Sequence, residues 1–273
     1  MRIYKYKDLF SLLATLGWLS FVYSAFKGFH FWYLGFIFFF WLSLGILNYR
    51  HESTLWLMEN RWSRFAKYYF TLAVLGFLAD YIIGQALTGV WSYPFYNSIS
   101  DWLRLYLLIY PIGGLSTIEL IYFLASIFRE KVVLIHEDVK NLLVTKLEFS
   151  TDILLILAII TYLISKTIIP LSHIQSIIIV LFSVWIILTT FKLKYYLKHW
   201  THWIAIIGAS AILSIFVHEI PNTAVHEWKY YPPHLFPDYS ILGIQLWLIW
   251  GWYLLVLVML KYWIQIVLLK GRK

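Results

Sequence analysis

The stretch at residues 88–94 reads Thr-Gly-Val-Trp-Ser-Tyr-Pro and separates two long apolar runs of the chain. A looser copy at 223–232 reads Thr-Ala-Val-His-Glu-Trp-Lys-Tyr-Tyr-Pro and separates two others. Both copies keep the order Thr, small residue, Val, then Trp-x-Tyr and Pro. Two interpretations remain open: an internal duplication, or chance recurrence in a chain with 15 Trp and 21 Tyr.

The composition places the chain in a membrane. Of its 273 residues, 61% are hydrophobic and 13% are charged, and the mean hydropathy is +0.73. Soluble domains are about half apolar, so this excess indicates a polytopic membrane protein. The chain has no cysteine, which excludes disulfides, thiolate metal sites and a cysteine nucleophile.

Eight segments are apolar over about the 20 residues that a membrane-spanning helix needs. They are 9–26, 29–47, 65–87, 103–128, 153–169, 174–191, 203–220 and 241–267. The sequence therefore predicts an all-α transmembrane bundle of about eight helices, forming one domain over 1–273. If the two halves are duplicated, 1–128 and 150–268 are parallel four-helix repeats. Residues 129–149 then form a cytoplasmic connector.

The basic residues are distributed unevenly over this layout. Eighteen of the 22 Lys and Arg fall in the terminal segments and in alternate loops, all on one side. Positive charge favours the cytoplasmic side, so we expect both termini in the cytoplasm and both Trp-x-Tyr stretches outside the cell membrane. The net charge of +8 is thus an orientation signal with an attraction to membrane lipids, and no nucleic-acid partner is expected.

Two carboxyls lie at membrane depth, where ionisable groups are costly and often functional. Asp80 is about 12 Å inside the third predicted span, and Glu119 is near the middle of the fourth. The first Trp-x-Tyr loop joins these spans, so we expect both carboxyls to face one cavity. A buried, protonated carboxyl can act as a general acid. The alternative is a structural acid that binds hydroxyl groups for helix packing.

Aromatic and helix-bending residues surround these carboxyls. Pro111, Gly113 and Gly114 can bend the fourth span or let a neighbour approach, or can serve helix packing alone. The candidate substrate-binding residues are aromatic: Trp91, Tyr93, Tyr81, Tyr110, Trp102 and Tyr122.

The second half carries polar residues near its own Trp-x-Tyr stretch. His218, Glu219 and His226 form a possible metal cluster at the outer surface, but no HExxH or similar spacing occurs. We therefore expect interfacial hydrogen bonds there and no metal. His199-x-x-His202 lies on the opposite, cytoplasmic side, and no residue of the second half corresponds to Glu119.

The first half resembles the lycopene cyclase domain over about 40 residues. The resemblance rests on Asp80-Tyr81, on Trp91-Ser92-Tyr93, and on a Pro and a Glu in the next span. These cyclases are small helical membrane enzymes of carotenoid biosynthesis, built from two related multi-helix units. Their Pro-x-Glu-Glu type motif is replaced here by Pro111 and a single Glu119, eight residues apart.

The resemblance implies an isomerase, an intramolecular lyase without a redox cofactor. Glu119 would protonate a polyene double bond, Asp80 would be its partner, and aromatic faces would stabilise the carbocation. The competing hypothesis is a non-enzymatic lipid-binding, transport or assembly protein with structural carboxyls. We expect membrane lipids and an apolar lipid or isoprenoid ligand as partners, and no cofactor. The sequence leaves the oligomeric state open.

Overall fold

The computed structural model describes residues 6–49, 53–130, 171–231 and 239–268, together with the single positions 153 and 160. The described chain is mostly helical, as predicted. The first half contains α1 (Lys7–Phe26), α2 (Trp32–Leu47), α3 (Thr54–Asn60), α4 (Trp62–Gly76), the π-helix η2 (Phe77–Leu87), β1 (Trp91–Ser92), α5 (Ile99–Arg104), the π-helix η3 (Leu105–Ile109) and α6 (Tyr110–Ile127).

The second half contains further long helices and three short strands. They are α8 (Leu171–Tyr196), α9 (Trp200–Val225), β2 (Lys229–Tyr230), β3 (Ser240–Ile241), β4 (Ile244–Gln245), α10 (Leu248–Trp263) and the π-helix η4 (Ile264–Leu268). Strand β1 pairs with β2, and β3 pairs with β4, both antiparallel.

Seven of the eight predicted spans coincide with helices. The remaining one, 153–169, and nearly all of the predicted connector lie outside the described residues. Five helical segments are long and apolar enough to cross a membrane: Lys7–Phe26, Trp62–Ala86, Ile99–Ile127, Trp200–Val225 and Leu248–Leu268. Helix α2 is a shorter apolar helix.

Three predicted boundaries were wrong. Residues 241–247 do not begin the last helix, because Leu242 and Gly243 adopt positive φ and turn the chain between β3 and β4. Helix α9 does not stop at residue 220 but continues through Pro221 to Val225. The segment between the predicted spans 29–47 and 65–87 is partly helical, since the Ser53 side chain accepts from Trp56 N and begins α3.

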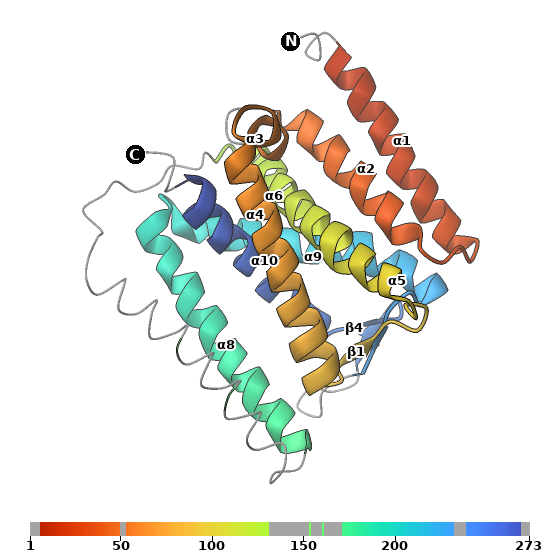
Figure 1. Ribbon diagram of the computed structural model, residues 1–273. Coiled ribbons are helices and arrows are strands. Elements are labelled where there is room, and N and C mark those ends of the chain that lie inside the picture. The colour runs from red at the N-terminus through yellow and green to blue at the C-terminus, as the bar shows by residue number, and fades with distance from the viewer. Residues whose placement is uncertain are drawn as a thin grey trace.

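The connections alternate between two ends of the bundle. Figure 1 shows α3 and the start of α4 at one end, and β1 and β4 at the other. We call the second one the ladder end, after the β1–β2 pair. Both Trp-x-Tyr stretches lie there, so the fold brings together segments that are more than 100 residues apart.

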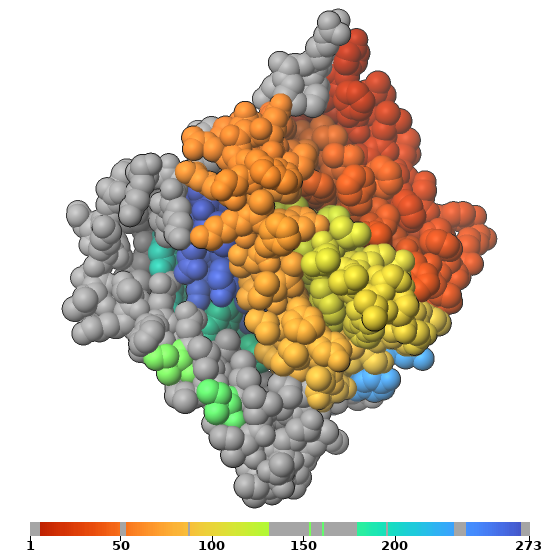
Figure 2. Space-filling model, in the orientation of Figure 1, coloured from red at the N-terminus to blue at the C-terminus, as the bar shows by residue number. Residues whose placement is uncertain are grey.

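Helix α6 lies at the centre of the bundle and α1 at its edge. Of the 18 most apolar consecutive residues in the segment Ile99–Ile127, which ends with α6, 72% are buried. The corresponding share in α1 is 17%. Figure 2 shows α1, in red, along one edge of the molecule. Close packing of α4 on α6 requires small residues, because a Cβ on Gly76 or Gly114 would lie under 3 Å from Tyr110 or Leu72.

Candidate functional site

The two Trp-x-Tyr stretches meet in a short ladder at the ladder end. Trp91 lies opposite Tyr230, and Ser92 lies opposite Lys229. Ser92 and Lys229 are each the middle residue of their own Trp-x-Tyr. The register is therefore symmetric about this central pair, as if a two-fold axis passed between the two stretches.

Beneath the first stretch, four side chains donate hydrogen bonds to the buried carboxyl of Asp80. Trp91 Nε1 and Tyr93 OH donate to Oδ1 over 2.5 and 3.0 Å. Tyr106 OH and Gln85 Nε2 donate to Oδ2 over 2.7 and 2.8 Å. We call these five residues the Asp80 clamp. Both carboxyl oxygens are occupied by protein donors.

Local sequence explains how Trp91 reaches Asp80. Gly84, on η2, leaves room for the indole: a Cβ there would lie 2.0 Å from Trp91 Cζ2. Gly89 has a φ of +64°, a conformation that suits glycine, and turns the chain back towards η2. Val90 N then donates to Gly84 O over 2.9 Å, which holds the returning strand against the helix.

Beneath the second stretch, Glu219 of α9 is held in the same manner. Trp228 Nε1 donates to Oε2 over 3.1 Å. Tyr230 OH and Trp252 Nε1 donate to Oε1 over 2.7 and 2.9 Å. We call these four residues the Glu219 clamp. The sequence predicted hydrogen bonds for Glu219 but placed it at the outer surface, whereas its side chain is buried.

The two clamps use corresponding parts of the chain. In each, a carboxyl near the end of one helix accepts from the following Trp-x-Tyr, and then from an aromatic residue of the next helix, Tyr106 or Trp252. A positive-φ residue, Gly89 or His226, lies two positions before each Trp. The acid that corresponds to Asp80 is thus Glu219, a relation that a comparison of the acids upstream of the two stretches could have found.

The structure does not bring Glu119 to Asp80. Glu119 Oε1 accepts from Thr54 N and Thr54 Oγ1 over 2.7 and 2.5 Å, and Oε2 accepts from Asn48 Nδ2 over 3.0 Å. These partners lie after α2 and at the start of α3, away from the ladder end. Glu119 is nine residues beyond Tyr110, about 14 Å along α6. It joins α6 to the α2–α3 connection.

The predicted binding aromatics divide into three groups. Trp91 and Tyr93 contact Asp80, and Tyr110 OH lies 3.2 Å from Tyr93 OH. Trp102 stacks on Tyr106 at 5.9 Å between ring centroids, whereas Tyr81 is exposed and stacks on Phe77. Tyr122 belongs to another region, where its OH accepts from Trp263 Nε1 over 2.8 Å.

The possible metal cluster of His218, Glu219 and His226, where the sequence favoured hydrogen bonds over a metal, does not assemble. His218 Nδ1 lies 2.9 Å from Tyr33 OH, and the His218 ring stacks on Trp252 at 4.9 Å. His226 is exposed. Within the described ranges, the one group of three side chains close enough to share a metal ion is Glu130, His199 and His202, at the opposite end of the bundle.

A fourth buried carboxyl, Glu227, lies between the two halves. Tyr96 OH donates to Glu227 Oε1 over 2.5 Å, and the Arg104 guanidinium lies over the rings of Phe31 and Tyr96. Burial raises the pKa of Glu227, although the hydrogen bond from Tyr96 opposes this. Burial, then the neighbouring carboxyl of Asp80 or Glu219, also raises the pKa of Tyr93 and of Tyr230. These phenols therefore remain donors at neutral pH.

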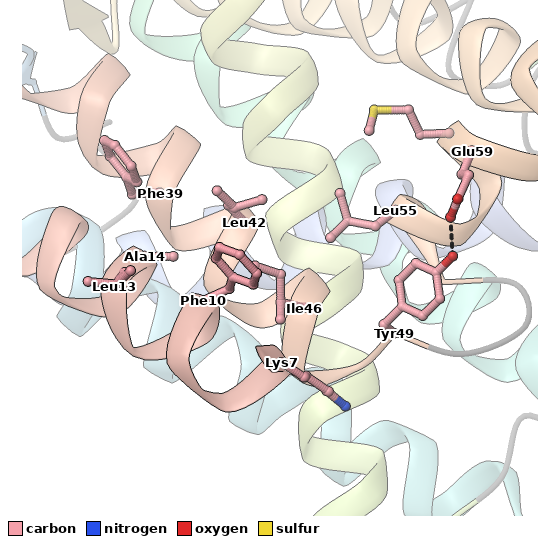
Figure 3. Close-up of a pocket in the computed structure, with 11 residues that line it drawn as sticks. Lys7, Phe10, Leu13, Ala14, Phe39, Leu42, Ile46, Tyr49, Leu55 and Glu59 are labelled. Carbon is pink, nitrogen blue, oxygen red and sulfur yellow. Dashed lines mark hydrogen bonds between the residues drawn. The ribbon is translucent and has the colours of Figure 1, made fainter. Parts of the chain in front are cut away.

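An apolar groove of about 620 Å³ lies along α1, α2 and α3. Figure 3 shows its apolar side chains, with Lys7, Tyr49 and Glu59 towards one end. Lys7 Nζ donates to Leu47 O over 2.6 Å, and Tyr49 OH donates to Glu59. The apolar lining consists of Phe10, Leu13, Ala14, Phe39, Leu42, Ile46, Leu55 and Met58.

Comparisons of the chain with protein-family models, with curated proteins and with solved structures gave no match.

Proposed function

We propose that this protein is a multi-pass membrane protein that binds the hydrocarbon chain of a membrane lipid or isoprenoid between α1 and α2. The groove along these helices supports the proposal. Its volume of about 620 Å³ lies within the ordinary range of small-molecule sites, and its walls are apolar except at one end. Such a site suits a long hydrocarbon chain with a polar head.

The polar end of the groove indicates where the head of the ligand would lie. Lys7 and Glu59 place one positive and one negative group there, and Tyr49 OH donates to Glu59. The sequence just before α1 contains two further basic residues, Arg2 and Lys5. A head group with an anionic or hydrogen-bonding part, at the cytoplasmic face of the cell membrane, matches this charge pattern.

The buried carboxyls serve the architecture in this proposal. A general acid needs a proton-bearing oxygen within reach of its substrate. Protein donors occupy both oxygens of Asp80 and of Glu119. A smaller cavity of about 450 Å³ lies beside α10. Neither Asp80 nor Glu119 lines this cavity or the groove along α1, α2 and α3. These contacts favour the lipid-binding hypothesis over acid-catalysed cyclisation.

Lipid that copurifies with the protein tests the proposal. Leu13 lines the groove, and Leu12 does not. Their exposed fractions are alike, 53% and 56%. Native mass spectrometry of Leu13→Trp should show the bound lipid reduced at least several-fold relative to wild type, whereas Leu12→Trp should retain it.

The mass of the retained species separates a phospholipid from an isoprenoid. Equal lipid retention by Leu13→Trp and Leu12→Trp, with both variants folded, would reject the groove as the binding site. A defined product formed from that lipid by wild type, and lost in a Glu119→Gln variant that is expressed and folded like wild type, would instead support the enzymatic hypothesis.

A further inference from the structure

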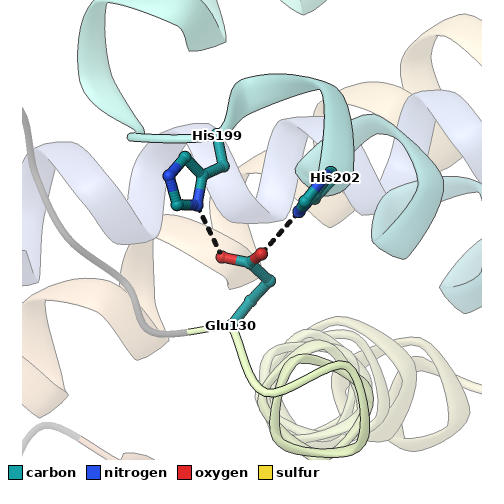
Figure 4. A group of neighbouring side chains, drawn as sticks. All are labelled: Glu130, His199 and His202. Atoms are coloured by element: carbon teal, nitrogen blue, oxygen red, sulfur yellow. Dashed lines mark hydrogen bonds and ion pairs between the residues drawn. The ribbon is translucent and has the colours of Figure 1, made fainter.

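A second polar site lies at the end of the bundle away from the ladder. Glu130 follows α6, where Arg129 has a positive φ and Glu130 N donates to Ala125 O over 2.8 Å. His199 precedes α9 with a φ of +57°, and His202 lies in the first turn of α9. These backbone conformations turn the three side chains towards one point, as Figure 4 shows.

The three potential ligand atoms are close enough to share one ion. His202 Nδ1 lies 2.5 Å from Glu130 Oε1, and His199 Nδ1 lies 3.3 Å from Glu130 Oε2. All three ligand atoms lie within 4.8 Å of one another. Ligands bound to tetrahedral zinc at 2.0–2.2 Å are about 3.4 Å apart. A small increase in the distance between the carboxylate and the imidazoles would therefore make room for the ion.

We propose that Glu130, His199 and His202 bind a divalent transition-metal ion, with Zn²⁺ as the best fit. Two imidazole nitrogens and one carboxylate oxygen are a donor set that zinc favours, and three protein ligands leave a fourth position for water. The exposed fractions of the two histidine side chains, 53% and 62%, give the ion access from solvent.

Metal binding there would join two parts of the fold that are distant in sequence. Glu130 comes from the end of α6, and both histidines come from the junction of α8 and α9, about 70 residues later. The ladder already joins the two halves at the other end of the bundle. The ion would fix them at this end as well, and would make the stability of the bundle depend on metal concentration.

Spectroscopy with Co²⁺ tests this site directly. The full-length protein would be purified in detergent with a tag free of histidine, stripped with a chelator and titrated with Co²⁺ and then with Zn²⁺. We expect visible d–d absorption from one Co²⁺ per chain, which Zn²⁺ displaces, and a higher thermal midpoint with Zn²⁺. The chain has no cysteine, so no thiolate absorption interferes.

Variants assign the binding to these three side chains. His202→Asn and Glu130→Gln should weaken Co²⁺ binding at least tenfold. His226→Asn, an exposed histidine at the ladder end with a φ of +52°, should leave binding unchanged. No Co²⁺ band, or equal binding by His202→Asn and wild type, would overturn the proposal and leave a hydrogen-bonded cluster only. The His202 side chain lies at the surface. We therefore expect His202→Asn to stay folded even if Glu130→Gln unfolds the protein.

Discussion

The Asp80 clamp and the Glu219 clamp each supply hydrogen-bond donors to a buried carboxyl, but with different residues. Each satisfies a buried carboxyl with the Trp and Tyr of its own loop and one aromatic donor of the next helix. The first clamp adds an amide donor, Gln85. What is common to both is a helix end tied to the loop that follows it. The aromatic residues of both loops are thus hydrogen-bond donors to buried carboxyls.

The clamps differ in how the chain reaches the carboxyl. Asp80 lies on the π-helix η2, 11 residues before Trp91, whereas Glu219 lies on the α-helix α9, 9 residues before Trp228. The aspartate side chain is shorter by one methylene. A longer connection and a widened helix thus accompany the shorter acid, which shows that the hydrogen-bond pattern is kept while the backbone varies.

Removal of either carboxyl should have the largest effect. Asp80→Ala leaves four hydrogen-bond donors without their acceptor, and Glu219→Ala leaves three. We expect each to lower the free energy of unfolding by about 3–5 kcal/mol, with the larger loss for Asp80→Ala. Thermal and denaturant unfolding in detergent would measure this. A loss below about 1 kcal/mol in either variant would contradict the clamp as a stabilising unit.

A cross-link at the centre of the ladder tests how the two clamps are joined. Opposite residues in an antiparallel pair have Cα atoms about 4.5–5.5 Å apart, within disulfide range. Ser92→Cys with Lys229→Cys should therefore form an internal disulfide. It should raise the free energy of unfolding by about 2–4 kcal/mol. Mobility in non-reducing gels would report it, and Ser92→Cys with Ser240→Cys is the control that should not cross-link.

Gly84→Ala should damage the Asp80 clamp alone. Its Cβ would overlap the Trp91 indole, so we expect a loss of about 1–3 kcal/mol from overpacking. Gly208→Ala and Gly251→Ala are controls in the second half, since a Cβ at either position meets nothing within 4 Å. These controls should be neutral or stabilising in the same unfolding measurement. Equal losses in all three variants would show that overlap with the Trp91 indole does not decide the effect.

The smallest expected effect comes from the two turns before the tryptophans. His226 adopts a positive φ where the first half has Gly89. Histidine is strained there relative to glycine. His226→Gly should stabilise the protein by about 0.5–1 kcal/mol, whereas Gly89→His should destabilise it. Thermal midpoints of the two variants would measure the difference, and a lower midpoint for His226→Gly would mean that the His226 side chain has a stabilising role.

Composition and apolar length were sufficient to predict most of the long helices. A long apolar segment is stable as a helix in an apolar environment, so its length and composition are enough to predict that helix. The hairpin at 240–245 was missed because an apolar run was taken for helix, although Gly243 was a turn signal. The predicted span ended at residue 220, but Asn222 binds the backbone of Trp228 and stabilises a later end.

The site was harder to predict than the helices. The repeated Trp-x-Tyr stretches and the buried Asp80 were visible in the sequence, but hydrogen-bond partners depend on the depth and rotation of each helix. Asp80 and Glu119 are on consecutive predicted spans, and adjacency alone suggested one cavity. Glu130 lies about 70 positions before His199 and His202. The His-x-x-His spacing alone therefore could not show that a carboxylate completes the group.

The symmetric register of the β1–β2 ladder implies that one half of this chain could meet a copy of itself. In a dimer with a two-fold axis, a residue on the axis faces its own twin. Ser92 and Lys229 occupy that place within a single chain. Within a single chain, the two residues at this position are free to differ, and here a hydroxyl group faces an ammonium group.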